Sequence, residues 1–77
     1  MDRMRPVTGH IGWVFDEERQ AYLTIDRSFA IVPMVASLNY ACYKLGSGPD
    51  YSYTRHVEFL MFEDAIQWCN MMRAVGA

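Results

Sequence analysis

The chain contains no long apolar run, no cluster of basic residues and few cysteines. No stretch approaches the roughly 20 apolar residues that cross a bilayer, and no apolar segment follows the basic N-terminus, so neither a membrane span nor a secretory signal is predicted. The seven basic residues are scattered and are outnumbered by nine acidic ones, which argues against non-specific nucleic-acid binding. We therefore expect a protein of the cytoplasm.

Residue types that carry metal or catalytic chemistry are also sparse. The zinc-binding types are two histidines and two cysteines, at His10, Cys42, His56 and Cys69. No two of them lie at the short spacings that hold a zinc ion, so we expect no metal and no cofactor. Two cysteines are too few for a disulfide framework, and we expect both to pack in reduced form as small hydrophobic residues. Without a catalytic motif, we do not expect an enzyme.

Apolar side chains, by contrast, are abundant. They make up 52% of the residues, and 14% of the residues are aromatic. A chain of 77 residues forms one small domain, which buries only about 60–65% of the surface that its unfolded chain exposes. We expect residues 1–9 to be a flexible N-terminal arm and residues 10–77 to be a single domain. Surplus apolar surface then faces a protein partner or a second copy in a homodimer.

The last third of the chain changes from a strand pattern to a helix pattern. From Tyr51 to Met61 apolar and aromatic residues alternate with polar ones, which is typical of a half-buried strand. From Phe62 onward the apolar residues recur every three or four positions, which is typical of one face of a helix. The sequence therefore predicts a strand over residues 51–61 that runs directly into a C-terminal helix.

The N-terminal half predicts a hairpin. Residues 11–15 alternate large apolar side chains, residues 21–25 alternate again, and the polar segment 16–20 joins the two runs.

The middle segment, residues 29–45, allows two interpretations. A helix would have Pro33 at its first position and Gly46 just past its end. Alternatively the segment divides at Pro33 into a short extended piece, 29–32, and a strand, 37–45. We favour the strand, because residues 46–50 have the composition of a turn and would join it to the strand 51–61 as a second hairpin.

Together these elements predict an α+β fold. We expect a small antiparallel sheet of three to four strands with one C-terminal helix packed on one face. The predicted core residues are Trp13, Phe15, Leu23, Ile25, Val57, Phe59, Met61, Ile66, Cys69 and Met72.

Two segments are candidates for contact with a partner. The acidic loop of Asp16, Glu17 and Glu18 can meet a basic surface on a partner. The residues Tyr51, Tyr53 and Arg55 combine the side chains that are most enriched at binding hot spots. We expect a non-catalytic protein-binding module that uses one or both of these groups.

Small, mildly acidic α+β chains of this kind occur among phage accessory proteins. In size, in charge and in its strand-to-helix ending from Tyr51 to Val75, the chain resembles the anti-CRISPR inhibitors, which share no common motif. The resemblance implies a small rigid protein that docks on a larger nucleoprotein complex and blocks it in the host cytoplasm.

Two other functions remain open from the sequence. One is a small nucleic-acid-binding domain in which the tyrosines form a stacking platform for bases. The other is a structural subunit that self-associates through surplus hydrophobic surface.

Overall fold

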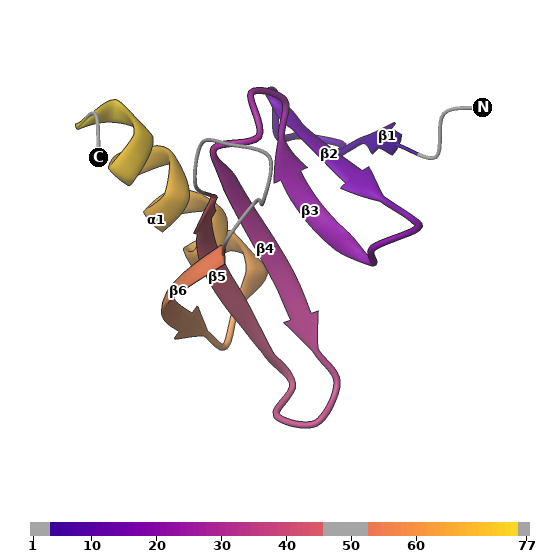
Figure 1. Cartoon of the computed structure of the whole chain (residues 1–77), viewed down its shortest axis with the longest axis vertical. Coiled ribbons are helices and arrows are strands. Elements are labelled where there is room, and N and C mark those ends of the chain that lie inside the picture. Colours follow the sequence, from indigo (N-terminus) through magenta and orange to yellow (C-terminus); the bar gives the residue numbers. More distant parts are fainter. Residues whose placement is uncertain (1–3, 46–52, 76–77) are drawn as a thin grey trace.

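The computed structural model describes residues 4–45 and 53–75, with side-chain positions for residues 4–44 and 57–75. Figure 1 shows an antiparallel sheet with a helix packed against one part of it. In chain order the elements of the described residues are β1 (Met4–Pro6), β2 (Trp13–Asp16), β3 (Ala21–Thr24), β4 (Phe29–Met34), β5 (Asn39–Leu45), β6 (Tyr53–Phe59) and α1 (Phe62–Ala74).

The fold is α+β with a C-terminal helix on an antiparallel sheet, as predicted, but the sheet of the described chain has six strands rather than three to four. The strands follow one another in the order β1-β2-β3-β4-β5-β6. One additional strand is β1, which lies within the segment predicted as an arm and pairs Met4 with Asp16 and Pro6 with Val14. A proline is tolerated there because β1 is an edge strand.

The N-terminal hairpin is confirmed. β2 and β3 pair from Trp13↔Thr24 to Asp16↔Ala21, so the connection between them is residues 17–20. The second additional strand is β4. The structure excludes the helical interpretation of residues 29–45, because β4 and β5 form an antiparallel ladder from Phe29↔Lys44 to Met34↔Asn39.

Pro33 lies inside β4 and does not end it, contrary to the expectation that it divides the segment. The ladder between β3 and β4 consists of Tyr22↔Ile31 and Leu23↔Ala30. Pro33 lies beyond this ladder, so the N–H that it lacks is not needed as a donor to β3.

The second predicted hairpin is also found, with β5 paired to β6, although the predicted turn at residues 46–50 lies outside the described residues. The ladder contains a β-bulge, because Cys42 pairs with Val57 whereas the next residue, Tyr43, pairs with Arg55. A bulge inserts one extra residue into one strand and reverses the alternation beyond it. The regular alternation predicted from Tyr51 to Met61 is therefore interrupted within β6.

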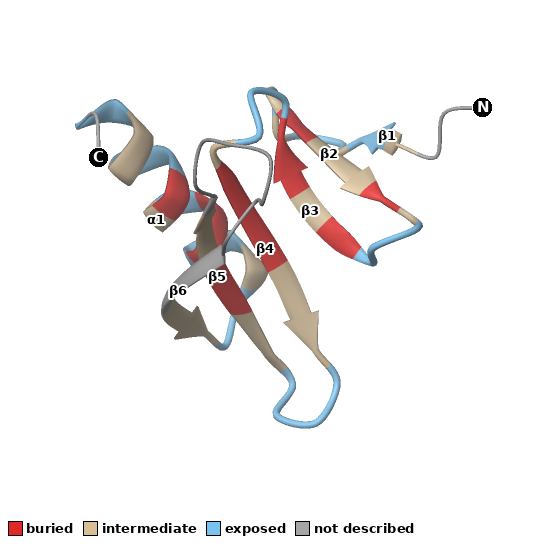
Figure 2. Cartoon of the chain, viewed as in Figure 1, coloured by how far each residue is buried: buried red, intermediate tan, exposed pale blue. Residues whose placement is uncertain are grey.

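Helix α1 packs on β4, β5 and β6, and the main core lies beneath it. Buried residues form a red band across β2 to β5 and along one side of the helix in Figure 2. The fully buried members of this cluster are Trp13, Phe29, Ile31, Cys42, Ala65, Ile66 and Cys69, with Val57, Phe59 and Met72 partly buried against it. A smaller cluster of Leu23 and Ala30 is covered by Met4, Val14 and Tyr43.

Three predicted core residues do not lie in the core. Ile25 is 68% exposed because β3 ends at Thr24, and Ile25 belongs to the turn that follows. Met61 is 58% exposed because it occupies the N-cap position of α1, between β6 and the helix. Phe15 is only partly buried and packs on Tyr22, with ring centroids 4.8 Å apart.

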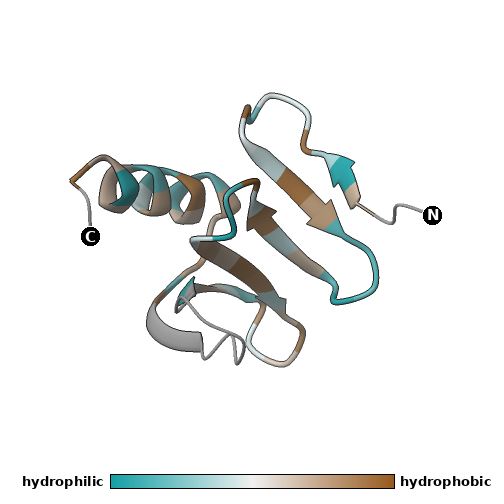
Figure 3. Cartoon of the chain, turned by 45° about the horizontal axis from the view of Figure 1, so that its top comes forward, coloured by the Kyte–Doolittle hydropathy of each residue, from teal (hydrophilic) through white to brown (hydrophobic). Residues whose placement is uncertain are grey.

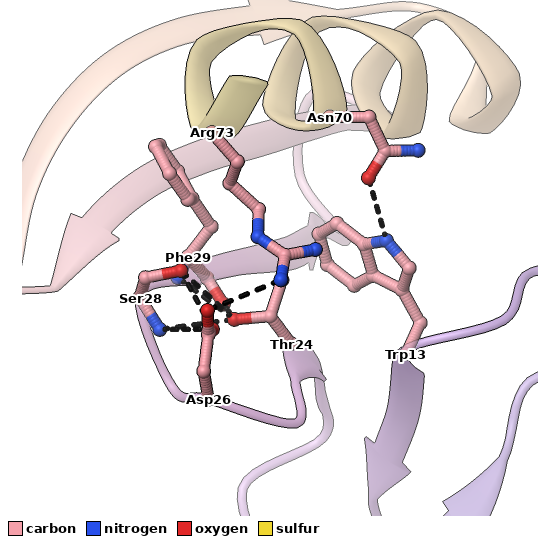
Figure 4. A network of polar contacts seen from close by, with 7 residues as sticks. All are labelled: Trp13, Thr24, Asp26, Ser28, Phe29, Asn70 and Arg73. Carbon is pink, nitrogen blue, oxygen red and sulfur yellow. Dashed lines mark hydrogen bonds and ion pairs between the residues drawn. The ribbon is translucent and has the colours of Figure 1, made fainter. Parts of the chain in front are cut away.

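Side-chain contacts from α1 also reach the N-terminal half of the sheet, which is formed by β1 to β3, whereas β4 to β6 form the other half. Figure 4 shows Trp13 of β2 donating a hydrogen bond from Nε1 to Asn70 Oδ1 over 3.2 Å. At the same end of β3, just past Thr24, Arg73 Nη2 lies 3.1 Å from Asp26 Oδ2. Because only two residue pairs join β3 to β4 in the described chain, these contacts help to hold the two halves of the sheet together.

Asp26 is the charged centre of the turn between β3 and β4. Its Oδ1 accepts hydrogen bonds from the backbone N–H of Ser28 over 3.0 Å and from the Ser28 hydroxyl over 2.7 Å. The Ser28 side-chain hydrogen bond, supported by Thr24, the Ser28 N–H and the Arg73 charge, lowers the pKa of Asp26 well below its usual range. These interactions favour the ionised carboxylate.

We predict that Asp26→Asn destabilises the protein by about 0.5–1 kcal/mol at pH 7, a modest cost because the side chain is exposed and screened. A folded-state pKa below the unfolded value contributes stability above the unfolded pKa, and that contribution is lost as the pH falls toward the folded pKa. The stability gap between wild type and variant should therefore narrow below about pH 3.9. Urea titrations at several pH values measure this gap, and a gap that stays constant down to pH 2 would contradict the assigned role.

Candidate functional site

Large apolar side chains are exposed at one end of the sheet. Val35 and Leu38 lie in the connection between β4 and β5 and are 90% and 75% exposed, and Leu60 and Met61 lie in the connection between β6 and α1. The pairs Met34↔Asn39 and Tyr40↔Phe59 bring these two connections to the same end of the sheet. We call Val35, Leu38, Leu60 and Met61 the apolar end.

A hollow of about 250 Å³ opens beside the apolar end. Its lining is formed by the β4–β5 hairpin and consists of Pro33, Met34, Val35, Leu38, Asn39 and Tyr40. Figure 3 shows the contrast between the two hairpin connections, with teal along the β2–β3 connection and brown on parts of the β4–β5 connection. A partner side chain can therefore insert next to the exposed apolar residues.

The backbone at Leu38 is in the left-handed region, with φ 60°. A leucine is unfavourable there, because its Cβ crowds the following carbonyl. Glycine has no Cβ, and asparagine is tolerated because its short polar side chain can hydrogen-bond locally. The N–H of Leu38 closes the connection by donating to the Met34 carbonyl over 2.8 Å. Leu38 therefore combines a strained backbone with an exposed apolar side chain.

A second hollow, of about 290 Å³, lies between β6 and α1. Its lining is Phe59, Asp64, Gln67, Trp68 and Met71. The four helical residues lie three or four positions apart and so share one face of α1. We call this hollow the β6–α1 groove.

The predicted acidic loop is not uniformly solvated. The side chain of Asp16 is only 3% exposed, and its Oδ1 accepts hydrogen bonds from the backbone N–H groups of Glu18 and Arg19. Its Oδ2 lies 2.7 Å from Arg19 Nη1. The Arg19 side-chain hydrogen bond lowers the pKa of Asp16 although burial opposes this. Asp16 therefore stabilises the β2–β3 turn, and its buried carboxylate does not offer the predicted contact with a partner.

The other two acidic residues of the loop are more accessible. Glu17 is partly buried and forms an ion pair with Arg5, just beyond Met4 in β1, whereas Glu18 is exposed. A role for Glu17 and Glu18 in binding remains a prediction.

The predicted aromatic site falls mostly outside the described residues. Tyr51 lies outside them, and Tyr53 and Arg55 belong to β6 but their side chains lie outside the described set. Two further tyrosines, both in β5, are described. Tyr40 packs on Phe62 of α1 with ring centroids 5.5 Å apart, whereas Tyr43 packs in the smaller cluster with Leu23 and Ala30. Tyr40 and Tyr43 therefore lie on opposite faces of β5 and do not form one stacking surface.

The predicted packing of the cysteines is confirmed. Cys42 and Cys69 are free thiols, both are completely buried, and Cys42 donates a weak hydrogen bond to the Ala65 carbonyl over 3.9 Å. The hydrogen bond with Cys42 and burial raise the pKa of Cys69 far above its usual range. Thiolate chemistry is disfavoured by such an environment.

His10, a candidate zinc ligand, packs against the start of α1. Its Nε2 lies 3.1 Å from Glu63 Oε1, and its ring meets the edge of Phe62 with centroids 5.7 Å apart. The His56 side chain lies outside the described residues. In the described part of the chain, no three histidine, cysteine, aspartate or glutamate side chains are arranged to hold a metal ion.

The apolar end and the β6–α1 groove were both missed by sequence analysis. Val35 and Leu38 follow a proline inside an otherwise apolar segment, which hides the fact that they belong to an exposed connection. A sequence signal existed at Leu60 and Met61, since two apolar residues stand where a strand must turn into a helix.

Comparisons with known proteins give no further assignment. No protein-family model, no curated protein and no solved structure matches the chain at a significant level. Among the described residues, α1 is too short and too polar to cross a bilayer.

The structural role of Asp16 predicts a sharp difference within the acidic loop. Asp16→Ala should cost about 1–3 kcal/mol, because two backbone N–H groups and Arg19 lose a buried, charged acceptor. Glu18→Lys should change stability by no more than about 0.5 kcal/mol, as exposed substitutions do. Urea unfolding monitored by tryptophan fluorescence measures both, and equal stabilities for the two variants would show that the Asp16 carboxylate is dispensable.

Proposed function

We propose that the chain is a non-catalytic protein-binding module and that it contacts its partner through the apolar end. The observation that carries this proposal is Leu38, which is exposed and sits at a left-handed backbone position. Residues in strained backbone conformations cluster at active sites and ligand-binding sites.

Stability alone does not favour leucine at this position. A left-handed conformation costs a bulky residue roughly 1–2 kcal/mol, and asparagine or glycine would remove most of this cost. The side chain recovers little of it through burial, because 75% of Leu38 remains exposed. Together with Val35, Leu60 and Met61, Leu38 instead provides apolar area that a partner can bury next to the hollow at Tyr40.

The identity of the partner is a separate question. The resemblance in size and charge to small phage inhibitors favours a larger nucleoprotein complex that the chain blocks by docking. Exposed apolar residues also favour a second candidate, self-association of two copies through the same surface. Both forms use contact area rather than catalysis, and both require the apolar end.

Leu38→Asn tests the proposal, because it should separate stability from binding. We expect the variant to be more stable by about 1 kcal/mol, since asparagine accepts the left-handed backbone, and to lose the partner that the wild type retains. Arg27→Asn is the matched control, because Arg27 is also exposed and also has a left-handed backbone, with φ 62°. It should gain similar stability and keep the partner.

Thermal melts measure the stability of the three proteins. Affinity-tagged versions retained in lysate of the source cells, compared by quantitative mass spectrometry, measure partner binding, and light scattering of the purified proteins detects a homodimer. If Leu38→Asn retains the same proteins as the wild type and the same oligomeric state, the apolar end is not the contact surface.

A further inference from the structure

β6 forms the last strand of the sheet. One edge of β6 pairs with β5, and among the described residues no strand pairs with the other edge. An edge strand presents backbone N–H and C=O groups that another extended chain can pair with. The bulge opposite Cys42 and Tyr43 interrupts this edge, so the regular part next to the helix is the short segment 57–59.

The β6–α1 groove opens beside this short edge. Phe59 ends β6, and it faces Trp68 of α1 with ring centroids 6.4 Å apart. Met71 extends the apolar lining one turn further along the helix and is 58% exposed. A volume of about 290 Å³ suits one large apolar side chain inserted from an added strand.

The charge on the wall of the groove selects what can lie next to that apolar side chain. Asp64 lines the groove and has no hydrogen-bond or ion-pair partner among the described residues. Several other described acids are engaged, as in the contacts of Asp16 with Arg19, Glu63 with His10 and Asp26 with Arg73. An added chain therefore gains from a cationic side chain near Asp64.

We propose that segment 57–59 and the β6–α1 groove bind a short extended segment of a partner protein. This segment contains a bulky apolar residue and, two positions before or after it, a lysine or arginine. The two-residue separation follows from the strand period, since alternate side chains of an added strand point to the same face. The backbone of the segment pairs with the β6 edge, the apolar side chain enters the groove, and the cation meets Asp64. This site lies on α1 and β6 and goes beyond the contact proposed for the apolar end.

Synthetic peptides with blocked ends test the inference directly. The probe is Thr-Phe-Thr-Lys-Thr, and the comparison peptides replace its lysine with glutamate or its phenylalanine with alanine. Amide chemical shifts of the ¹⁵N-labelled protein report binding. We expect the lysine peptide to bind saturably, the glutamate peptide to bind about two- to fivefold more weakly, as an exposed ion pair allows, and the alanine peptide to lose saturable binding. Asp64→Asn should remove the difference between the lysine and glutamate peptides.

A second exposed apolar residue serves as the control that locates the site. Met71 and Ile11 are both exposed, but Ile11 does not line the groove. Met71→Lys should weaken binding of the lysine peptide at least tenfold, whereas Ile11→Lys should leave it unchanged. Equal effects of the two substitutions would overturn the assignment to the groove.

Backbone pairing is tested with the same peptide carrying alternate N-methyl groups, which remove its backbone donors. We expect this peptide to lose binding, and we expect the unmodified peptide to slow hydrogen exchange at amides of residues 57–59. Binding of the N-methylated peptide with undiminished affinity would overturn strand addition, and so would the absence of saturable binding by every peptide. Leu38→Asn should bind the probe normally, so failure of this site is distinguishable from failure of the apolar end.

Discussion

The contact between α1 and both halves of the sheet is the constraint on which the rest of the structure depends. Two residue pairs join β3 to β4 within the described chain, a short seam for a six-stranded sheet. Trp13 of β2 is buried with Ile66 and Cys69 of α1, and the Trp13–Asn70 hydrogen bond fixes its orientation. The helix thus provides the shared hydrophobic core that the short seam cannot provide.

This arrangement determines which surfaces are left exposed. The inner face of α1 is occupied by the core, so its remaining apolar residues, such as Met71, line the β6–α1 groove. The β4–β5 hairpin extends past the ladder with β3, so Leu38 and Val35 stand at its tip without cover from the N-terminal strands. A small domain with one modest core cannot bury all of its apolar surface. Part of this surplus lies at the apolar end and in the β6–α1 groove, where it offers apolar area to another protein, and Ile11, Ile25 and Val75 are exposed elsewhere.

Periodicity in the sequence predicted the elements whose ends coincide with a change of pattern. The start of α1 at Phe62 and the N-terminal hairpin were found because helix and strand periods differ clearly there. Ile25 and Met61 were assigned to the core because alternation was extended one or two residues past the ends of β3 and β6. The predicted break at Pro33 in β4 and the predicted regular alternation through β6 were wrong. A single sequence does not show which neighbour a strand residue pairs with, or where a bulge occurs.

The candidate surfaces were harder to predict because they depend on tertiary position. Asp16 belongs to an acidic run, which favours a position exposed to solvent. An aspartate that begins a turn, however, commonly accepts hydrogen bonds from backbone N–H groups, and here Asp16 is buried. The left-handed backbone of Leu38 and the space between Trp68 and Phe59 follow from the hairpin and helix packing rather than from local composition.

Native-state hydrogen exchange on Ile66→Val tests the bridging role of α1 most directly. The substitution removes one buried methylene, which costs about 0.5–1.5 kcal/mol, and leaves the strands unchanged. If α1 holds both halves together, the most protected amides of β2 and β3 should lose the same free energy of protection as those of β4 and β5. Loss of protection confined to β4, β5 and β6, with β2 and β3 unaffected, would contradict the bridging role of the helix.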